Sequence, residues 1–127
     1  GNRLSGSIPA ALGNLSNLWR LLLNNNQLSG SIPPELGNLS SLQWLDLSDN
    51  QLSGSIPAEL GNLSSLRVLY LHTNGLLSGP LPVSLTNLTQ LYVFYHYNTG
   101  LCEPRDAAFQ AWLAGIGNRQ GTRLCEG

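Results

Sequence analysis

Four polar side chains in the middle of the chain have the chemistry needed for acid–base catalysis. Asp46 and Asp49 could serve as carboxylate bases, and His72 and His96 could exchange a proton near neutral pH. A catalytic site would also need a nucleophile motif, a glycine-rich phosphate loop or a metal-spaced cluster, and the sequence offers none of these. We therefore interpret the four residues as solvated surface groups, with His96 satisfied internally if it points inward, and predict that the chain is not an enzyme.

The two cysteines, Cys102 and Cys125, flank a predicted short helix near the C-terminus. Without a histidine close by they form an incomplete zinc set, so we predict no metal site and no cofactor. Their placement favours a disulfide, which would close a loop worth roughly 3 kcal/mol and implies an oxidising compartment. Two buried free thiols are the alternative.

The segments that must position all these residues are repeats. The pattern N-x-L-S-G-x-I-P starts at Asn2, Asn26 and Asn50, 24 residues apart, and returns at Asn74 with one inserted residue. A second block, Leu-Gly-Asn-Leu-Ser or its variant Leu-Thr-Asn-Leu-Thr, lies between these anchors. It begins at Leu12, Leu36, Leu60 and Leu85.

Each unit contains the core L-x-x-L-x-L-x-x-N, whose alternating leucines predict one short strand with the leucines inward. One unit cannot bury that row alone, so the units must stack with parallel strands about 4.8 Å apart. The repeated asparagine is predicted to hydrogen-bond backbone groups of adjoining turns, and the Ile-Pro step to add short strand pairing. The Leu-Gly-Asn-Leu-Ser block is predicted to form short 3₁₀ or α turns on the convex flank.

The combined motif L-x-x-L-x-L-x-x-N-x-L-S-G-x-I-P-x-x-L-G-N-L resembles the plant-type leucine-rich-repeat family, over about residues 1 to 101. That family includes receptor-like kinase ectodomains, receptor-like proteins and polygalacturonase inhibitors, with similar bacterial and algal extracellular proteins. The pattern and the resemblance together indicate an α/β fold, a right-handed leucine-rich-repeat solenoid with a concave parallel β-sheet. The resemblance implies roles such as receptor recognition, defence or adhesion.

The C-terminal segment has a different composition and is expected to form a cap. Its apolar stripe, with period i, i+3, i+4, i+7, predicts a short helix that lies across the last repeat. Asp106 is the predicted N-cap and Gly117 the predicted stop. The stripe consists of Phe109, Trp112, Leu113 and Ile116. We therefore expect about four repeats of 24–25 residues in 1–101 and a disulfide-linked helical cap in 102–127.

The N-terminal end carries no paired-cysteine segment of the kind with which plant-type ectodomains usually open. The first repeat is therefore expected to expose an apolar stacking face that includes Leu4, Ile8 and Leu12. Either further repeats or another copy of the chain would cover it.

Recognition is expected on the strand positions that alternate with the inward leucines. The candidate concave binding surface consists of Arg20, Leu22, Trp44, Asp46, Val68, Tyr70, His72, Tyr95 and Tyr97. In the fourth unit we expect one residue of the repeat to be absent before Asn98. If Asn98 takes the ladder position, Tyr95 points inward, and if Phe94 takes the leucine position, Tyr95 and Tyr97 point outward. The aromatic residues could form a recognition surface, or could simply pack on one another as good strand formers.

Each repeat also carries one N-x-Ser/Thr sequon at the same position. The candidate N-glycosylation sites are Asn14, Asn38, Asn62 and Asn87. Glycans there would decorate the convex or lateral face and leave the concave sheet free. Alternatively, Asn-Leu-Ser is only the consensus that the turn requires.

The composition excludes several classes of partner. The net charge is −1, and the six basic residues are scattered arginines, which is unlike a nucleic-acid-binding patch. No apolar run approaches the roughly 20 residues that cross a bilayer, so we expect no direct membrane insertion by this segment. The cysteines and the resemblance favour an extracellular or cell-surface location.

Two functions from different classes follow. The first is a non-catalytic recognition module that binds an extracellular protein, peptide or glycan on its concave face. The second is an extracellular scaffold that self-assembles by end-to-end stacking through the uncapped first repeat.

Overall fold

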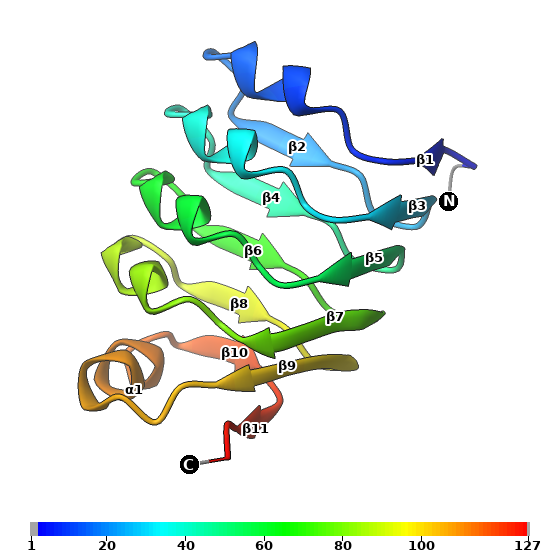
Figure 1. Cartoon of the computed structure of the whole chain (residues 1–127). Helices are drawn as coiled ribbons and strands as arrows, with labels where there is room; N and C mark the ends of the chain where they lie inside the picture. The colour runs from blue at the N-terminus through cyan, green and yellow to red at the C-terminus, as the bar shows by residue number, and fades with distance from the viewer. Residues whose placement is uncertain (1–2, 127) are drawn as a thin grey trace.

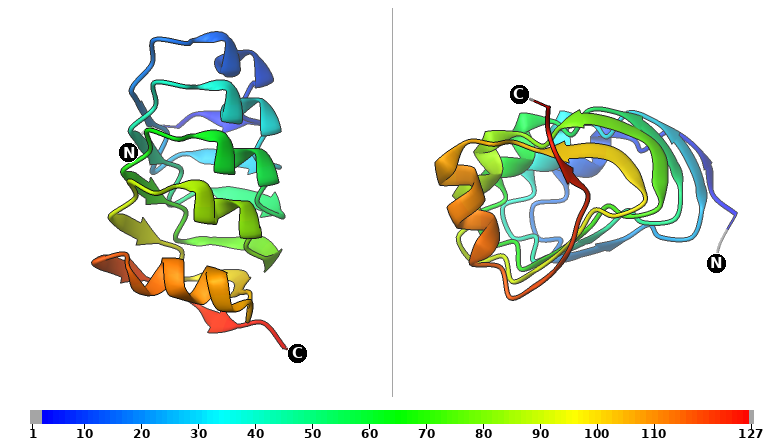
Figure 2. Two further views of the ribbon diagram at one scale, coloured as in Figure 1. Left: turned by 90° about the vertical axis from the view of Figure 1, so that its left-hand side faces the viewer. Right: turned by 90° about the horizontal axis from the view of Figure 1, so that it is seen from below.

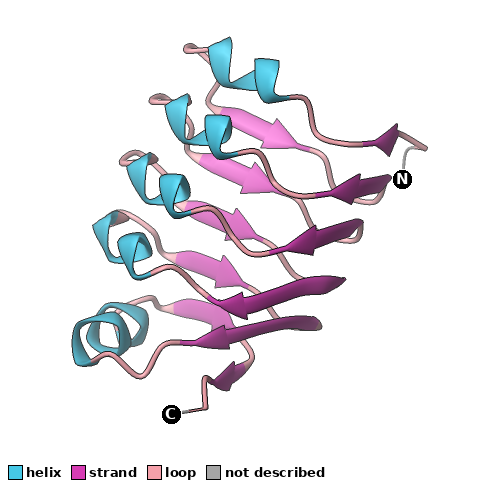
Figure 3. Ribbon diagram, in the orientation of Figure 1, coloured by secondary structure: helices cyan, strands magenta, loops and turns pink. Residues whose placement is uncertain are grey.

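The computed structural model describes residues 3–126 and shows a stack of similar turns wound into a right-handed solenoid (Figure 1). Each full turn contributes one strand to a concave sheet, one strand to a second sheet and one short helix. Figure 3 shows these helices in a column along one side, with the strands of the two sheets running in register beside them. Asn2, the first repeat asparagine, lies outside the described residues.

The concave sheet is parallel throughout, in the order β10-β8-β6-β4-β2. Its strands are β2 (Arg20–Leu22), β4 (Trp44–Asp46), β6 (Val68–Tyr70), β8 (Val93–Tyr95) and β10 (Asn118–Gln120). The middle leucine of each of β2, β4 and β6 points inward, as the alternation predicts. Strand β10 comes from the C-terminal segment, where the sequence suggested only a helix.

The second sheet is also parallel and runs in the order β1-β3-β5-β7-β9-β11. Its strands are β1 (Ser5–Gly6), β3 (Gln27–Gly30), β5 (Gln51–Gly54), β7 (Asn74–Pro80), β9 (Thr99–Glu103) and β11 (Arg123–Leu124). The strand pairing of β3 and β5 ends before the Ile-Pro step, which was predicted to take part in it. Proline has no N–H to donate to a neighbouring strand, and here it is the N-cap residue of the following 3₁₀ helix. The inserted residue makes β7 bulge, which leaves Leu76 exposed.

Short 3₁₀ helices form the convex flank, as predicted. They are η1 (Ala10–Asn14), η2 (Pro34–Asn38), η3 (Ala58–Asn62) and η4 (Val83–Asn87). Gly13, Gly37 and Gly61 face a backbone carbonyl of the next helix, so closely that a Cβ atom would collide with it. The repeated glycine therefore sets how tightly these helices stack. Thr86 replaces it in η4, whose next neighbour is the α-helix of the cap.

The interior is a continuous column of leucines between the two sheets and the helices. Leu45, Leu47, Leu69 and Leu71 are completely buried, and so are Leu42 and Leu66, which precede β4 and β6. Each turn shares this core with its neighbours, so burying the leucine row depends on stacking.

The repeated asparagine forms the predicted ladder. Asn74 Nδ2 donates to the carbonyl oxygens of Leu47 and Leu71 at 2.9 and 3.1 Å, and its Oδ1 accepts from the Leu52 amide at 3.1 Å. Asn50 repeats this arrangement one turn earlier. The side chain thus joins adjacent turns at the point where the chain leaves the concave sheet.

The fourth unit keeps the repeat frame with different residues, and no residue is missing from it. Thr99 takes the ladder position and pairs in register with Asn74, while Asn98 takes the preceding left-handed position with φ of 53°. Phe94 and His96 occupy the inward leucine positions. The alternative with Asn98 in the ladder and Tyr95 inward is therefore wrong.

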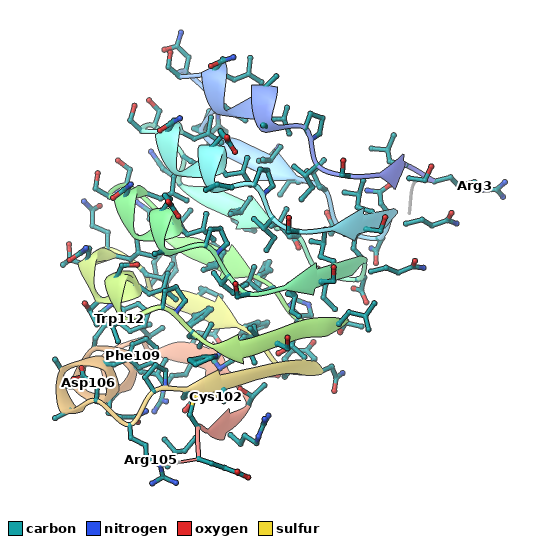
Figure 4. The ribbon with its side chains drawn as sticks, in the orientation of Figure 1. Arg3, Cys102, Arg105, Asp106, Phe109 and Trp112 are labelled. Carbon is teal, nitrogen blue, oxygen red and sulfur yellow. A yellow bond between two sulfur atoms is a disulfide. The ribbon has the colours of Figure 1, made fainter. Side chains whose placement is uncertain are left out.

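The C-terminal segment closes the stack with helix α1 (Ala107–Ala114) in place of a 3₁₀ helix (Figure 4). Phe109 and Leu113 are buried in the common core, and Trp112 Nε1 donates to the Leu88 carbonyl at 3.1 Å. The Asp106 side chain accepts from the Phe109 amide, which confirms the N-cap. The predicted stop at Gly117 is wrong, because Gly115 already ends the helix.

The predicted disulfide between Cys102 and Cys125 is confirmed. Cys102 lies in β9, and the Cys125 amide donates to the Glu103 carbonyl, so the bond joins neighbouring strands of the second sheet. Strand β9 runs across the predicted boundary at residues 101 and 102.

The first repeat has no neighbour within the described residues (Figure 2). Leu4 is 53% exposed and Leu12 is half-buried, but the prediction of an exposed Ile8 is wrong, because its side chain turns into the core and is only 4% exposed. Leu15 and Trp19 are also exposed on this repeat. A concavity of about 270 Å³ lies here. It is lined by Leu4, Ser5, Ser7, Ile8, Pro9, Leu12, Leu23 and Leu28.

Candidate functional site

The strand register arranges the outward side chains of the concave sheet in rows that cross the repeats. One row contains Arg20, Trp44, Val68, Val93 and Asn118. The next contains Leu22, Asp46, Tyr70, Tyr95 and Gln120. His72 and Tyr97 lie beyond the ends of β6 and β8 and continue the surface.

Val68 is the predicted surface residue that this arrangement does not expose. Its side chain is outward by alternation, yet it is only 2% exposed, and Val93 beside it is also buried. Its register partners are Trp44 and Val93, and the short valine cannot reach past them. We therefore correct the prediction: Val68 supports the surface from below and is not available for contact.

Five residues that the sequence placed on this surface form one aromatic cluster, namely Trp44, Tyr70, His72, Tyr95 and Tyr97. The Tyr70 ring is 5.0 Å from that of Tyr95 and 6.2 Å from that of Trp44, centroid to centroid. His72 stacks on Tyr97 at 4.7 Å. The side chains of Trp44, Tyr70, His72, Tyr95 and Tyr97 are each partly exposed. The cluster therefore has both properties that the sequence allowed: the rings pack on one another, and they still face outward.

Burial and two nearby carboxylates determine the electrostatics of the cluster. Burial lowers the pKa of His72, although Asp46 and Asp49 oppose that effect. Burial, then the neighbouring Tyr95, raises the pKa of Tyr70. Asp46 Oδ1 accepts hydrogen bonds from the Ser48 amide at 3.0 Å and the Ser48 hydroxyl at 2.6 Å. The surface is thus apolar and aromatic with one anchored negative group.

Sequence reasoning missed two residues at the C-terminal edge of this surface. Asn118 Oδ1 accepts from the Tyr95 hydroxyl at 3.0 Å and fixes that ring. Gln120 extends the row of Tyr95. Strand β10 carries only polar, exposed residues, so no apolar alternation in the sequence could have revealed it.

The other histidine belongs to the interior and not to the candidate site. His96 is 1% exposed, and its Nε2 lies 3.1 Å from Glu103 Oε2. Burial, helped by Arg119, lowers the His96 pKa to about 4, and burial raises the pKa of Glu103. A neutral imidazole therefore occupies the position that leucine holds in the preceding turns. The described residues contain no group of three or more metal-ligating side chains.

The four sequon asparagines Asn14, Asn38, Asn62 and Asn87 are exposed at the ends of the 3₁₀ helices, on the flank away from the concave sheet. The leucine inside the sequon is buried in the second, third and fourth copies. Their glycosylation stays a prediction. Within residues 3–126, no helix has the length and apolar character of a membrane span.

Known proteins share this fold and its repeats. Two family models, both described as leucine-rich repeat, match the chain. One matches residues 29–76, and the other matches residues 17–39 and 65–95. No curated protein sequence matches the chain closely enough to count as a relative.

Solved structures match closely. The ectodomain of the Arabidopsis thaliana membrane receptor kinase GASSHO1/SCHENGEN3, crystallised with CASPARIAN STRIP INTEGRITY FACTOR 2, is 38% identical, with a TM-score of 0.85 over 98% of this chain and 14% of its own. The structure of the Arabidopsis receptor kinase HAESA with the peptide hormone IDA and the co-receptor SERK1 gives 37% identity, a TM-score of 0.87, and coverage of 98% and 21%. The BIR2 ectodomain from Arabidopsis thaliana is 36% identical, with a TM-score of 0.79 over 95% of this chain and 64% of its own.

The stacked parallel strands, asparagine ladder and 3₁₀ flank define a leucine-rich-repeat solenoid. The chain belongs to the leucine-rich-repeat family, and its repeats are of the plant receptor-like type. It spans between 14% and 64% of the length of the three structures described above.

Proposed function

We propose that this chain is a non-catalytic extracellular recognition module that binds a peptide or an extended protein segment on its concave sheet. The observation that carries the proposal is the aromatic cluster on a rigid surface. Tyrosine and tryptophan offer large contact area at low entropic cost and dominate recognition hot spots. Two of the matched receptor kinases support a ligand of this kind, because one was solved with CASPARIAN STRIP INTEGRITY FACTOR 2 and the other with the peptide hormone IDA. Residues 1–101 would form the recognition array and 102–127 its cap.

The extracellular location rests on two observations. A disulfide joins Cys102 in β9 to Cys125 after β11, and disulfides persist in oxidising compartments. The matched structures are ectodomains. Glycans on the sequon asparagines would then lie on the convex flank and leave the concave sheet accessible.

A display selection with random peptides tests the proposal, followed by calorimetric titration of the selected peptides. Tyr97→Ala removes one outward ring of the cluster, and Val83→Ala is the matched control on the exposed flank of η4. We expect Tyr97→Ala to weaken binding at least about tenfold and Val83→Ala to leave it unchanged. If the selected peptides bind Tyr97→Ala as tightly as the wild type, the proposal is overturned. A glycan array screened against the same variants shows whether a sugar is the ligand instead.

A second function, a self-assembling scaffold, is favoured by one observation. Leu4 and Leu15 are about half exposed on the first repeat, where β1 and β2 are edge strands of the two sheets, and such edges readily pair with another chain. At the C-terminal end α1 covers the core and β10 carries only polar residues, so apolar stacking would join two copies through their first repeats. Light scattering across a concentration series separates the two functions: a constant monomer mass rejects assembly, and growth to twice that mass supports it.

A further inference from the structure

The aromatic cluster borders an anionic group that no cation among the described residues neutralises. Asp46 is the last residue of β4, between β2 and β6 in the concave sheet, and Ser48 donates two hydrogen bonds to its Oδ1. The described residues give Oδ2 no hydrogen bond and place no cationic nitrogen within 4 Å of this carboxylate. The Ser48 contacts fix the carboxylate in place without neutralising its charge, so its second oxygen is oriented and available.

Two aromatic residues neighbour Asp46 on the sheet, and Leu22 lies on its other side. Tyr70 is the register partner of Asp46 on the adjacent strand, and Trp44 points outward from the same strand two residues earlier. The Trp44 and Tyr70 rings meet edge to face, with centroids 6.2 Å apart and planes at 77°. Ring faces carry negative potential, so two rings beside a carboxylate attract a cation more strongly than either feature alone.

Two arginines, Arg20 and Arg119, lie in strands of the concave sheet, and neither forms an ion pair with Asp46. Arg20 is the register partner of Trp44, but its guanidinium lies over the ring of Trp19, 5.2 Å from the centroid. Arg20 thus turns toward the lateral edge of the sheet. Burial lowers the pKa of His72 and so disfavours its charged form, although Asp46 and Asp49 oppose that effect.

We propose that Asp46, Trp44 and Tyr70 form a subsite for a cationic side chain, an arginine above all, carried by an extended peptide that continues over Tyr95 and Tyr97. This inference rests on the proposed function and names the chemistry of its ligand. A guanidinium fits best because its planar face stacks on a ring while its edge donates to a carboxylate. A matching acidic peptide would place a like charge against Asp46.

The test uses three pools of N-acetylated, C-amidated hexapeptides. The pools have the same composition except at one position, which is Arg in the first pool, its neutral analogue citrulline in the second and Glu in the third. Binding is measured by calorimetry with the wild-type chain, Asp46→Asn and Glu59→Gln. Asp46→Asn keeps the acceptor oxygen for Ser48, and Glu59→Gln makes the same charge change on the convex flank. We expect wild type and Glu59→Gln to bind the Arg pool about tenfold more tightly than the citrulline pool, and Asp46→Asn to lose that preference.

The outcomes separate this inference from the proposed function. Equal or tighter binding of the citrulline or Glu pool, or an Arg preference that survives Asp46→Asn, overturns the cationic subsite. If such binding is still lost in Tyr97→Ala, the concave recognition function stands without it. If no pool binds, or if neither Asp46→Asn nor Tyr97→Ala changes the binding, both the cationic subsite and the concave recognition function are rejected.

Discussion

At the scale of single residues, the ladder asparagine is the side chain with the most consequences for the fold. Asn74 is completely buried, and its amide group satisfies carbonyl oxygens of two adjacent turns. The Leu52 amide depends on it as well. Removing the side chain would leave several buried backbone groups without partners, and each such group is costly.

We therefore predict that Asn74→Ala lowers the free energy of unfolding by about 3 kcal/mol, measured by urea denaturation followed by circular dichroism. Asn62→Ala is the control, because Asn62 is exposed and its side chain makes no hydrogen bond within the described residues. It should change stability by less than about 0.5 kcal/mol. Similar losses in the two variants would contradict the structural role of the ladder.

The residue before each ladder position has a left-handed backbone, which suits some side chains better than others. Asn25, Asp49 and Asn98 tolerate it, but Thr73, with φ of 58°, is β-branched and strained there. We predict that Thr73→Asn raises the free energy of unfolding by about 1 kcal/mol and that the reciprocal change, Asn25→Thr, lowers it by a similar amount. Urea denaturation measures both. A destabilised Thr73→Asn would mean that the threonine makes a compensating contact.

At the scale of elements, the cap replaces the neighbour that the last repeat lacks. Helix α1 buries Phe109 and Leu113 against the core, and β10 and β11 extend both sheets by one strand. The disulfide ties β9 to the end of β11 across 23 residues of sequence. The cap therefore behaves as a divergent fifth turn.

The disulfide should stabilise this turn by limiting the unfolded chain. We predict that replacing Cys102 and Cys125 by alanine together lowers the free energy of unfolding by about 3 kcal/mol. Asp106→Ala, which removes only the helix N-cap, should cost about 1 kcal/mol. Urea titration of the two variants compares these costs. A double alanine variant as stable as the wild type would show that packing alone holds the cap.

The buried His96 makes the last repeat sensitive to acid. Its pKa of about 4 in the folded chain lies below the ordinary value of 6.5, so the unfolded chain takes up a proton first as the pH falls. The stabilising contribution is complete above about pH 6.5 and is lost between there and about pH 4. Glu103, whose pKa is raised by burial, acts in the opposite sense, and its contribution is lost as the pH rises.

We predict that the wild type loses on the order of 2 kcal/mol more stability than His96→Leu when the pH is lowered from 7 to 4.5. Leucine suits this site because Leu23, Leu47 and Leu71 hold the equivalent positions. Guanidinium denaturation at the two pH values gives the difference. Parallel pH profiles for the two chains would show that His96 is not the group responsible.

The elements that could be predicted from the sequence are those that repeat. Leu45 and Asn50 recur with the same neighbours in each turn, so strand, ladder and 3₁₀ flank follow from the period alone. The facing of the fourth strand could not be decided, because Phe94, His96 and Thr99 replace the leucines and the asparagine that mark the frame.

The other misses depend on neighbours that are distant in sequence. Ile8 and Val68 lie at predicted surface positions, but their burial is set by side chains from adjacent turns. Strand β10 has no apolar residue to bury, and it forms because β8 offers a free edge. The aromatic cluster was only partly predictable: its residues were found, and their mutual contacts were not.

At the scale of the whole molecule, the stack has one rigid concave surface and two unlike ends. The continuous leucine core and the parallel sheets hold the outward rows in fixed register, so the aromatic cluster and Asp46 form a preorganised surface. Preorganisation lowers the entropic cost of binding an extended ligand. Recognition should therefore be confined to the concave sheet and leave the rest of the molecule unchanged.

Hydrogen–deuterium exchange of the intact chain, with and without a saturating peptide selected by display, tests this most directly. We predict that protection increases in the segments containing β4, β6 and β8 and the turns that follow them. Segments of η1 to η4 and the open first repeat should exchange as before. Protection that falls instead on the 3₁₀ flank or on residues 3–19, with the concave strands unchanged, would contradict recognition on the concave sheet.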